Sequence, residues 1–240
     1  IQSIDCKSSV ITAPISRNRV WGLPYNSQLG MIKRLIGEAF LRVAGWKVEG
    51  ERPSVDRYVI IAAPHTSNWD MPFMLAFAFI YDIPVKWMGK HTLFEGPKGT
   101  FFKWLGGMPI IRHRPGGVVG QMIEAFENNE SLVLMVPAEG TRSHVDYWKS
   151  GFYHIARGAD VPVVLSYLDF GKKVGGIGPA LSMTGDISAD MDKIRAFYAG
   201  MQGFKPENVG AIRLREEDVE DVVAHDANEP EELDRLAGNL

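Results

Sequence analysis

The chain has 240 residues, of which 45% are hydrophobic and 23% are charged. This length and composition suit one globular domain with a substantial core, and the absence of repeats or low-complexity segments excludes a fibrous or array-like protein. Cys6 is the only cysteine, which excludes an intrachain disulfide and a cysteine-rich zinc site. A reducing compartment is therefore expected.

Charge is unevenly distributed along the chain. The net charge is -3, but residues 216–240 hold ten acidic residues against Arg235 alone, so residues 1–215 carry a balance of +6. We predict an acidic, loosely docked C-terminal tail at 216–240 and a body that favours anionic partners such as phosphates, coenzyme A or acidic membranes. A mixed solvated surface is the alternative. Nucleic acid is not expected, because the basic residues are scattered and no binding motif is present.

No segment is long enough to span a bilayer by its apolar character. The longest apolar stretches, 58–64 and 71–81, fall short of the ~20 residues that a membrane-spanning helix needs. Residues 1–28 form a predicted N-terminal extension that lacks the apolar run of a secretory signal. We expect a cytoplasmic protein.

Residues 30–45 are predicted to form an amphipathic helix with a basic face. Helical spacing relates the apolar residues Ile32, Leu35, Ile36, Ala39, Phe40 and Val43. Such a helix either lies in a membrane interface with its apolar face down, or packs on the sheet as an ordinary surface helix. The sequence leaves both alternatives open.

Apolar strands and helices alternate through the middle of the chain. Residues 58–63 read as a buried strand and 71–80 as a buried helix with Pro72 in its first turn. Further strands are predicted at 85–88, 131–136 and 161–167, and further helices at 116–128 and 152–158. This order predicts an α/β fold with a mainly parallel mixed sheet flanked by helices. Ligands of such sheets bind beyond the carboxyl ends of the strands, here at the loops after 58–63 and 131–136.

The first of these loops contains a histidine and a carboxylate five positions apart, His65 and Asp70. A turn between them can fold Asp70 back onto one ring nitrogen of His65 and leave the other nitrogen free as a general base. The alternative is structural: Asp70, two residues before Pro72, is well placed to cap the helix. The pair alone does not decide between the two.

The second loop reads Glu139-Gly140-Thr141-Arg142. Gly140 permits close approach of the backbone to a ligand, and Arg142 offers a planar fork for a phosphate or carboxylate. A glycine turn with a solvated arginine is the alternative.

Together with the intervening GGMPIIR segment, which ends at Arg112, these loops resemble the lysophosphatidic acid acyltransferase family of glycerolipid acyltransferases. HTSNWD (65–70) resembles the catalytic block, GGMPIIR the second block, AEGTRS (138–143) the third, and VPVV (161–164) the fourth, a proline-containing strand near the acyl site. Two residues depart from the family pattern, Pro64 before the histidine and Ala138 before the glutamate.

The resemblance implies an O-acyltransferase whose domain covers 29–215. His65 would deprotonate a hydroxyl of a lysophospholipid such as 1-acylglycerol-3-phosphate while Asp70 orients the imidazole. Arg112 and the 139–142 loop would hold the acceptor phosphate. Acyl-CoA or acyl carrier protein would supply the acyl group as co-substrate, with no bound cofactor and no metal.

The resemblance also implies an apolar acyl site, for which helix 71–79 and the aromatic residues Phe101, Phe102 and Trp104 are candidates. A peripheral location on the cytoplasmic face of a membrane is expected. Three alternatives remain open: a phospholipid-lysophospholipid transacylase, a hydrolase and a non-catalytic lipid-binding protein. A serine hydrolase is not expected, because no Gly-x-Ser-x-Gly motif is present.

Overall fold

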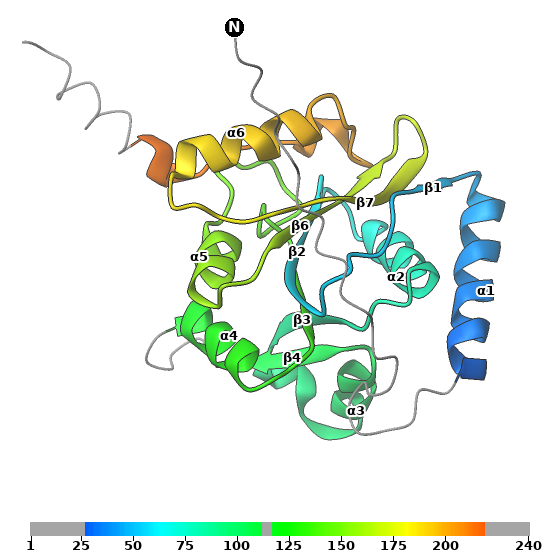
Figure 1. Ribbon diagram of the computed structural model, residues 1–240. Helices are drawn as coiled ribbons and strands as arrows, with labels where there is room; N and C mark the ends of the chain where they lie inside the picture. Colours follow the sequence, from blue (N-terminus) through cyan, green and yellow to red (C-terminus); the bar gives the residue numbers. More distant parts are fainter. Residues whose placement is uncertain (1–26, 112–116, 219–240) are drawn as a thin grey trace, which may run out of the picture.

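The computed structural model describes residues 27–111 and 117–218, which form one sheet with helices on both faces (Figure 1). The strands are β1 (Lys47–Glu49), β2 (Arg57–Ala63), β3 (Val85–Lys90), β4 (Gly107–Ile110), β5 (Leu132–Val136), β6 (Val163–Asp169) and β7 (Val174–Leu181). The α-helices are α1 (Ser27–Ala44), α2 (Asp70–Ile80), α3 (Gly96–Trp104), α4 (Gly117–Glu127), α5 (Gly151–Gly158) and α6 (Ile187–Tyr198). Two 3-10 helices are η1 (His91–Phe94) and η2 (Pro206–Asn208).

The sheet has seven strands in the order β1-β7-β6-β2-β5-β3-β4. All neighbouring pairs are parallel except β6 and β7. The predicted α/β class with a mainly parallel mixed sheet is confirmed. Because β2 and β5 are parallel neighbours at its centre, their carboxyl ends open onto the same edge, and the two candidate loops lie side by side.

The core follows from the alternation of side chains along the central strands. Val59 and Ile61 of β2 join a cluster with residues of α4, α5 and α6, whereas Tyr58 and Ile60 point to the opposite face. There, Ile60 lies with Phe77 of α2 around a small apolar cavity. With both faces covered, β2 is apolar along almost its whole length, as expected of a strand in a parallel sheet.

Helix α1 packs against α2 mainly along the side that carries Gly37 and Leu41. A β-carbon at Gly37 would lie 2.7 Å from the carbonyl oxygen of Ala76, so the close approach of the two helices requires glycine there. Leu41 is buried beside α2. The apolar residues Ile32, Leu35, Ile36, Phe40 and Val43, which we call the α1 apolar face, remain exposed, with Val43 as much as 91% accessible. The helix therefore packs on α2, with the ring centroids of Phe40 and Phe73 5.1 Å apart, and leaves most of its apolar residues accessible.

The start of the predicted acidic tail is part of the folded domain. Glu217 is buried, accepts a hydrogen bond from the Leu214 amide at 2.6 Å and forms an ion pair with Arg195. Tyr147 donates a hydrogen bond to Asp218. The boundary predicted at 216 therefore does not mark the end of packed structure, because these carboxylates have partners in the domain. Residues 219–240 and the predicted extension up to residue 26 lie outside the described residues.

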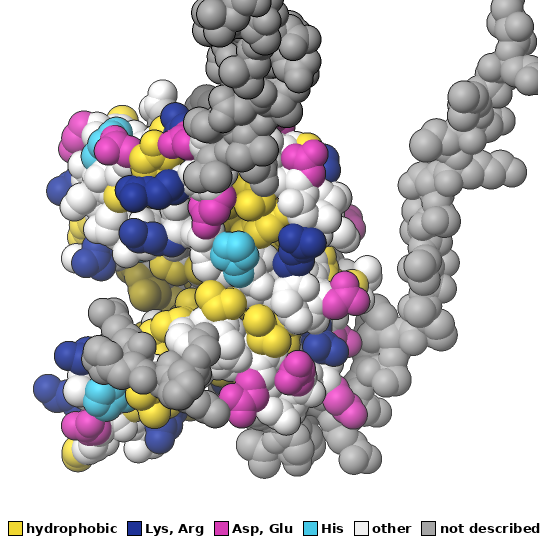
Figure 2. Space-filling view, turned by 90° about the vertical axis from the view of Figure 1, so that its left-hand side faces the viewer, with side chains coloured by type: hydrophobic (Ala, Val, Ile, Leu, Met, Phe, Trp, Pro, Cys, Tyr) yellow, Lys and Arg dark blue, Asp and Glu magenta, His cyan; other side chains and the backbone are white. Residues whose placement is uncertain are grey.

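The charged surface is mixed on the face shown in Figure 2. Lys and Arg side chains alternate there with acidic and apolar ones and form no continuous basic field. Among the described residues on this face, no basic patch stands out.

Candidate active site

The loop after β2 and the loop after β5 are joined directly. The backbone amide of His65 donates a hydrogen bond to Oε1 of Glu139 at 3.0 Å, across 74 positions of sequence. The adjacency of the two parallel strands makes this contact possible. The two sequence motifs therefore form a single structural unit.

His65 and Asp70 lie together inside that unit. Nδ1 of His65 is 3.0 Å from Oδ2 of Asp70, although the ring N–H does not meet the angular geometry of a hydrogen bond. The Asp70 side chain is only 1% exposed.

Asp70 is held by the loop that it supports. Its Oδ2 accepts hydrogen bonds from the backbone amides of Thr66 at 2.9 Å and Ser67 at 3.0 Å. Helix α2 begins at Asp70 itself, and its capping residue is Trp69, which makes no side-chain cap. The alternative in which Asp70 caps the helix is wrong, because the carboxylate folds back onto the loop instead of toward the first turn.

The His65 ring has one buried and one accessible side. Nδ1 is inaccessible, yet the side chain is 18% exposed, so the exposed surface belongs to its other atoms. An imidazole with a carboxylate at one nitrogen and access at the other has the arrangement of a general base. The chemistry available here is proton removal from a group that reaches Nε2.

Glu139 occupies a different position from the one predicted for it. Its side chain is buried, with 3% exposure, and faces the His65 backbone. Burial raises the pKa of this carboxyl above its ordinary value, while the hydrogen bond from the His65 amide acts in the opposite direction. A buried carboxylate is unsuited to contact a phosphate, since both groups are anionic. Its visible role is to hold the His65 loop.

The remaining residues of the second motif shape the turn that carries Arg142. Gly140 has a φ of 69°, a conformation that favours glycine, and its Cα lies against the Lys149 side chain. The Thr141 hydroxyl oxygen accepts a hydrogen bond from the Ser143 amide at 3.4 Å. Neither Gly140 nor Thr141 reaches the cavity described next.

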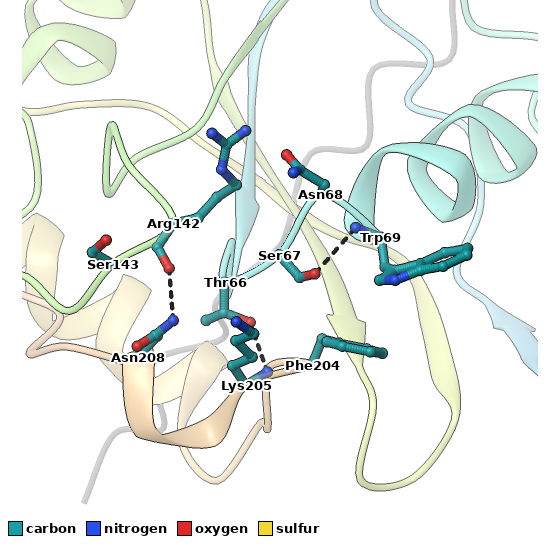
Figure 3. A pocket seen from close by; sticks show the side chains of 9 residues that line it. All are labelled: Thr66, Ser67, Asn68, Trp69, Arg142, Ser143, Phe204, Lys205 and Asn208. Carbon is teal, nitrogen blue, oxygen red and sulfur yellow. Dashed lines mark hydrogen bonds between the residues drawn. The ribbon is translucent and has the colours of Figure 1, made fainter.

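A cavity of about 410 Å³ opens beside this unit (Figure 3). Its lining residues are Thr66, Ser67, Asn68, Trp69, Arg142, Ser143, Phe204, Lys205 and Asn208. Of the predicted acceptor-binding residues within the described chain, Arg142 alone lines it, and His65 is the residue immediately before its wall. Phe204, Lys205 and Asn208 were missed by sequence reasoning, because their segment carries no motif and reaches the site only through the fold.

The other predicted parts of the site are Arg112 and the apolar acyl site. Arg112 lies outside the described residues. Helix α2 forms one wall of an apolar cavity against the sheet, but that space is only about 30 Å³, about the volume of one water molecule. Phe101 and Trp104, also proposed for the acyl site, are exposed on α3 instead of lining this cavity.

Within residues 27–111 and 117–218, no group of three or more His, Cys, Asp or Glu side chains is arranged to hold a metal ion. In the same part of the chain, no helix combines the length and apolar character that crossing a membrane requires.

A His-carboxylate pair at the carboxyl edge of a mainly parallel α/β sheet is an arrangement suited to activating a hydroxyl group. Residues 45–166, about half of the chain, match the family model described as Acyltransferase. The chain belongs to the acyltransferase family and is an enzyme that transfers acyl groups. The resemblance of its motifs to acyltransferases is confirmed at this level.

The other comparisons add little. No curated protein matches the sequence. Among solved structures, the 1-acyl-sn-glycerophosphate (LPA) acyltransferase PlsC from Thermotoga maritima is similar, with 17% identity over 85% of this chain and 82% of that chain and a TM-score of 0.47. A similarity of this size does not bear on substrate or mechanism.

Proposed function

We propose that this protein transfers a fatty acyl group from acyl-CoA or acyl carrier protein to a hydroxyl of a lysophospholipid such as 1-acylglycerol-3-phosphate. The observation that carries the proposal is the 3.0 Å contact between Nδ1 of His65 and buried Oδ2 of Asp70, beside a cavity lined by Arg142. Membership of the acyltransferase family supports acyl transfer as the type of reaction. The donor, the acceptor and the residue roles are the proposal.

The proposed reaction uses His65 as a general base. Nε2 takes the proton of the acceptor hydroxyl as its oxygen attacks the thioester carbonyl, and Asp70 stabilises the resulting imidazolium. The C–S bond then breaks, and the leaving thiolate receives the proton from His65. The products are an ester and a free thiol, with the histidine returned to its neutral form.

Arg142 is proposed to bind the acceptor phosphate in the cavity. A guanidinium offers two parallel N–H groups to phosphate oxygens, which fixes the acceptor as well as binding it. Because Thr66 lines the same cavity and follows His65 directly, a phosphate held there keeps the acceptor close to the base. We assign Glu139 to the support of the His65 loop and not to the phosphate.

The α1 apolar face is proposed to rest on the cytoplasmic face of a membrane. At 100° per residue, Lys33 and Arg42 flank it on its two sides, as in helices that lie in a bilayer interface. A row of aromatic rings leads from this face toward the cavity. Centroid distances are 5.1 Å from Phe40 to Phe73, 5.3 Å from Phe73 to Phe170 and 5.2 Å from Phe170 to Phe204, which lines the cavity.

Vesicle sedimentation tests the membrane proposal. The double variant Leu35→Ser with Ile36→Ser is expected to bind anionic vesicles about tenfold more weakly or worse, because two exposed apolar groups lose their burial in lipid. Arg34→Lys, which keeps its charge and lies on the same helix outside the α1 apolar face, serves as the control and should bind like the unmodified protein. Undiminished binding of the double variant contradicts the proposal.

The acyl transfer itself is tested by its requirement for both substrates. Thiol release from palmitoyl-CoA is expected only when 1-acylglycerol-3-phosphate is present. Release at the same rate without acceptor would identify a hydrolase. Ester formation from labelled phospholipid without any thioester would identify a transacylase.

A further inference from the structure

One wall of the cavity comes from a segment that follows α6 and lies outside the residues matched to the family. The segment is anchored on both loops of the site (Figure 3). The Lys205 amide donates a hydrogen bond to Oγ1 of Thr66 at 3.1 Å, and the Asn208 side chain donates to the carbonyl of Arg142 at 3.0 Å. A β-carbon at Gly203 would lie 2.6 Å from Oγ1 of Thr66, so this approach needs glycine. The segment is therefore fixed in place as one wall of the cavity.

This segment brings a second cation into the cavity. Lys205 and Arg142 both line it, and Figure 3 shows the Lys205 side chain running beside Thr66. Between residues 27 and 218, leaving aside 112–116, no Asp or Glu forms an ion pair with either side chain. Two cations in one cavity, with no carboxylate partner among the residues that the structure describes, give it a positive potential that an anion would neutralise.

We propose that Lys205 is a second cationic ligand for the phosphate of the acyl acceptor, acting with Arg142. The inference rests on the proposed function and deepens it. A phosphomonoester carries about -1.5 to -2 charges near neutral pH, so two cations match it, whereas a phosphodiester headgroup carries a single charge. The site therefore favours acceptors that end in a phosphomonoester, and this preference depends on a residue outside the matched domain.

The test compares Lys205→Gln, Lys205→Arg and a control, Lys47→Gln, which removes an exposed lysine on β1. Thiol release from acyl-CoA is measured with 1-acylglycerol-3-phosphate and with 1-acylglycerol, which lacks the phosphate. Lys205→Gln is expected to raise the KM for the phosphorylated acceptor about tenfold, as the loss of one charge-assisted hydrogen bond would, with kcat little changed. Lys205→Arg should retain most of the affinity. The reaction of 1-acylglycerol, which carries no phosphate, should change less in Lys205→Gln than the reaction of the phosphorylated acceptor.

An unchanged KM in Lys205→Gln would overturn the inference. So would an equal loss in Lys205→Gln and Lys205→Arg accompanied by a lower Tm, since that result assigns Lys205 a structural role. Phosphorus NMR titration with glycerol 3-phosphate separates this inference from the proposed function. Binding that weakens in Lys205→Gln, in a protein without transferase activity, would support the subsite and contradict the function. Equal binding of glycerol 3-phosphate by the unmodified protein and by Lys205→Gln would contradict the subsite.

Discussion

The acidic and basic residues at the carboxyl edge of the sheet lie in two different layers. Asp70 and Glu139 are buried and accept hydrogen bonds from backbone amides of residues 65–67. Arg142 and Lys205 are exposed and line the cavity. Under the proposed function, the carboxylates shape the loop that carries the base and the cations bind the ligand.

Removing the charge of Asp70, one of the two buried carboxylates that form the inner layer, gives the largest expected effect. Asp70→Asn keeps an oxygen that can accept from the Thr66 and Ser67 amides but no longer stabilises an imidazolium. We expect kcat to fall about 10²- to 10⁴-fold with little change in the KM of the acceptor. Thiol-release kinetics measure kcat and KM, and a thermal melt shows whether the variant is folded.

Asp146→Asn is the matched control, because Asp146 is exposed and lies 3.8 Å from His144 in a second His-Asp pair. It should behave like the unmodified protein. If Asp70→Asn kept its kcat, the assignment of the inner layer to catalysis would fail.

Removing a charge from the outer layer should affect binding instead. Arg142→Gln is expected to raise the KM for 1-acylglycerol-3-phosphate about 10- to 30-fold, because a bidentate charged contact is lost. Steady-state kinetics with the phosphorylated and the unphosphorylated acceptor measure the difference. An equal effect on both acceptors would show that Arg142 does not read the phosphate.

The smallest expected effect concerns stability, and Glu139 of the buried layer is the residue that tests it. Burial holds the pKa of the Glu139 carboxyl in the folded protein above its ordinary value. The contribution of Glu139 to stability is therefore complete below the pKa of the unfolded state. This contribution is lost as the pH rises through the pKa of the folded state. Glu139→Gln keeps an acceptor for the His65 amide without the charge. Its Tm relative to the unmodified protein should therefore increase by a few degrees from about pH 4 to about pH 8.

Thermal melts across that range, with exposed Glu207→Gln as control, measure this difference. A Tm difference that moves in the opposite direction as pH rises would mean that the Glu139 charge stabilises the fold.

Much of the fold was predictable because the central strands are apolar on both faces and the helices between them are long. The segments that escaped prediction have weaker patterns. Strand β1 has three exposed residues, and β7 (VGGIGPAL) contains three glycines and a proline, which are unusual in strands. Helix α3 begins with glycine and proline, which obscure its helical character.

The site was predictable only in part for a related reason. The motifs identified His65, Asp70 and Arg142 because these residues occur in short segments at fixed spacing. The direction of the Glu139 side chain depends on the packing of two loops that are distant in sequence. Lys205 enters the cavity through a contact with Thr66 across 139 positions, for which no local pattern exists.

Formation of the ester product by a His65→Ala variant tests the central claim most directly. With an isotope-labelled acyl thioester and 1-acylglycerol-3-phosphate, mass spectrometry measures the labelled ester formed per unit of time. We predict that His65→Ala loses about 10²-fold or more of the rate while exposed His144→Ala retains it. Ester formation at the unmodified rate by folded His65→Ala would contradict the assignment of His65 as the base.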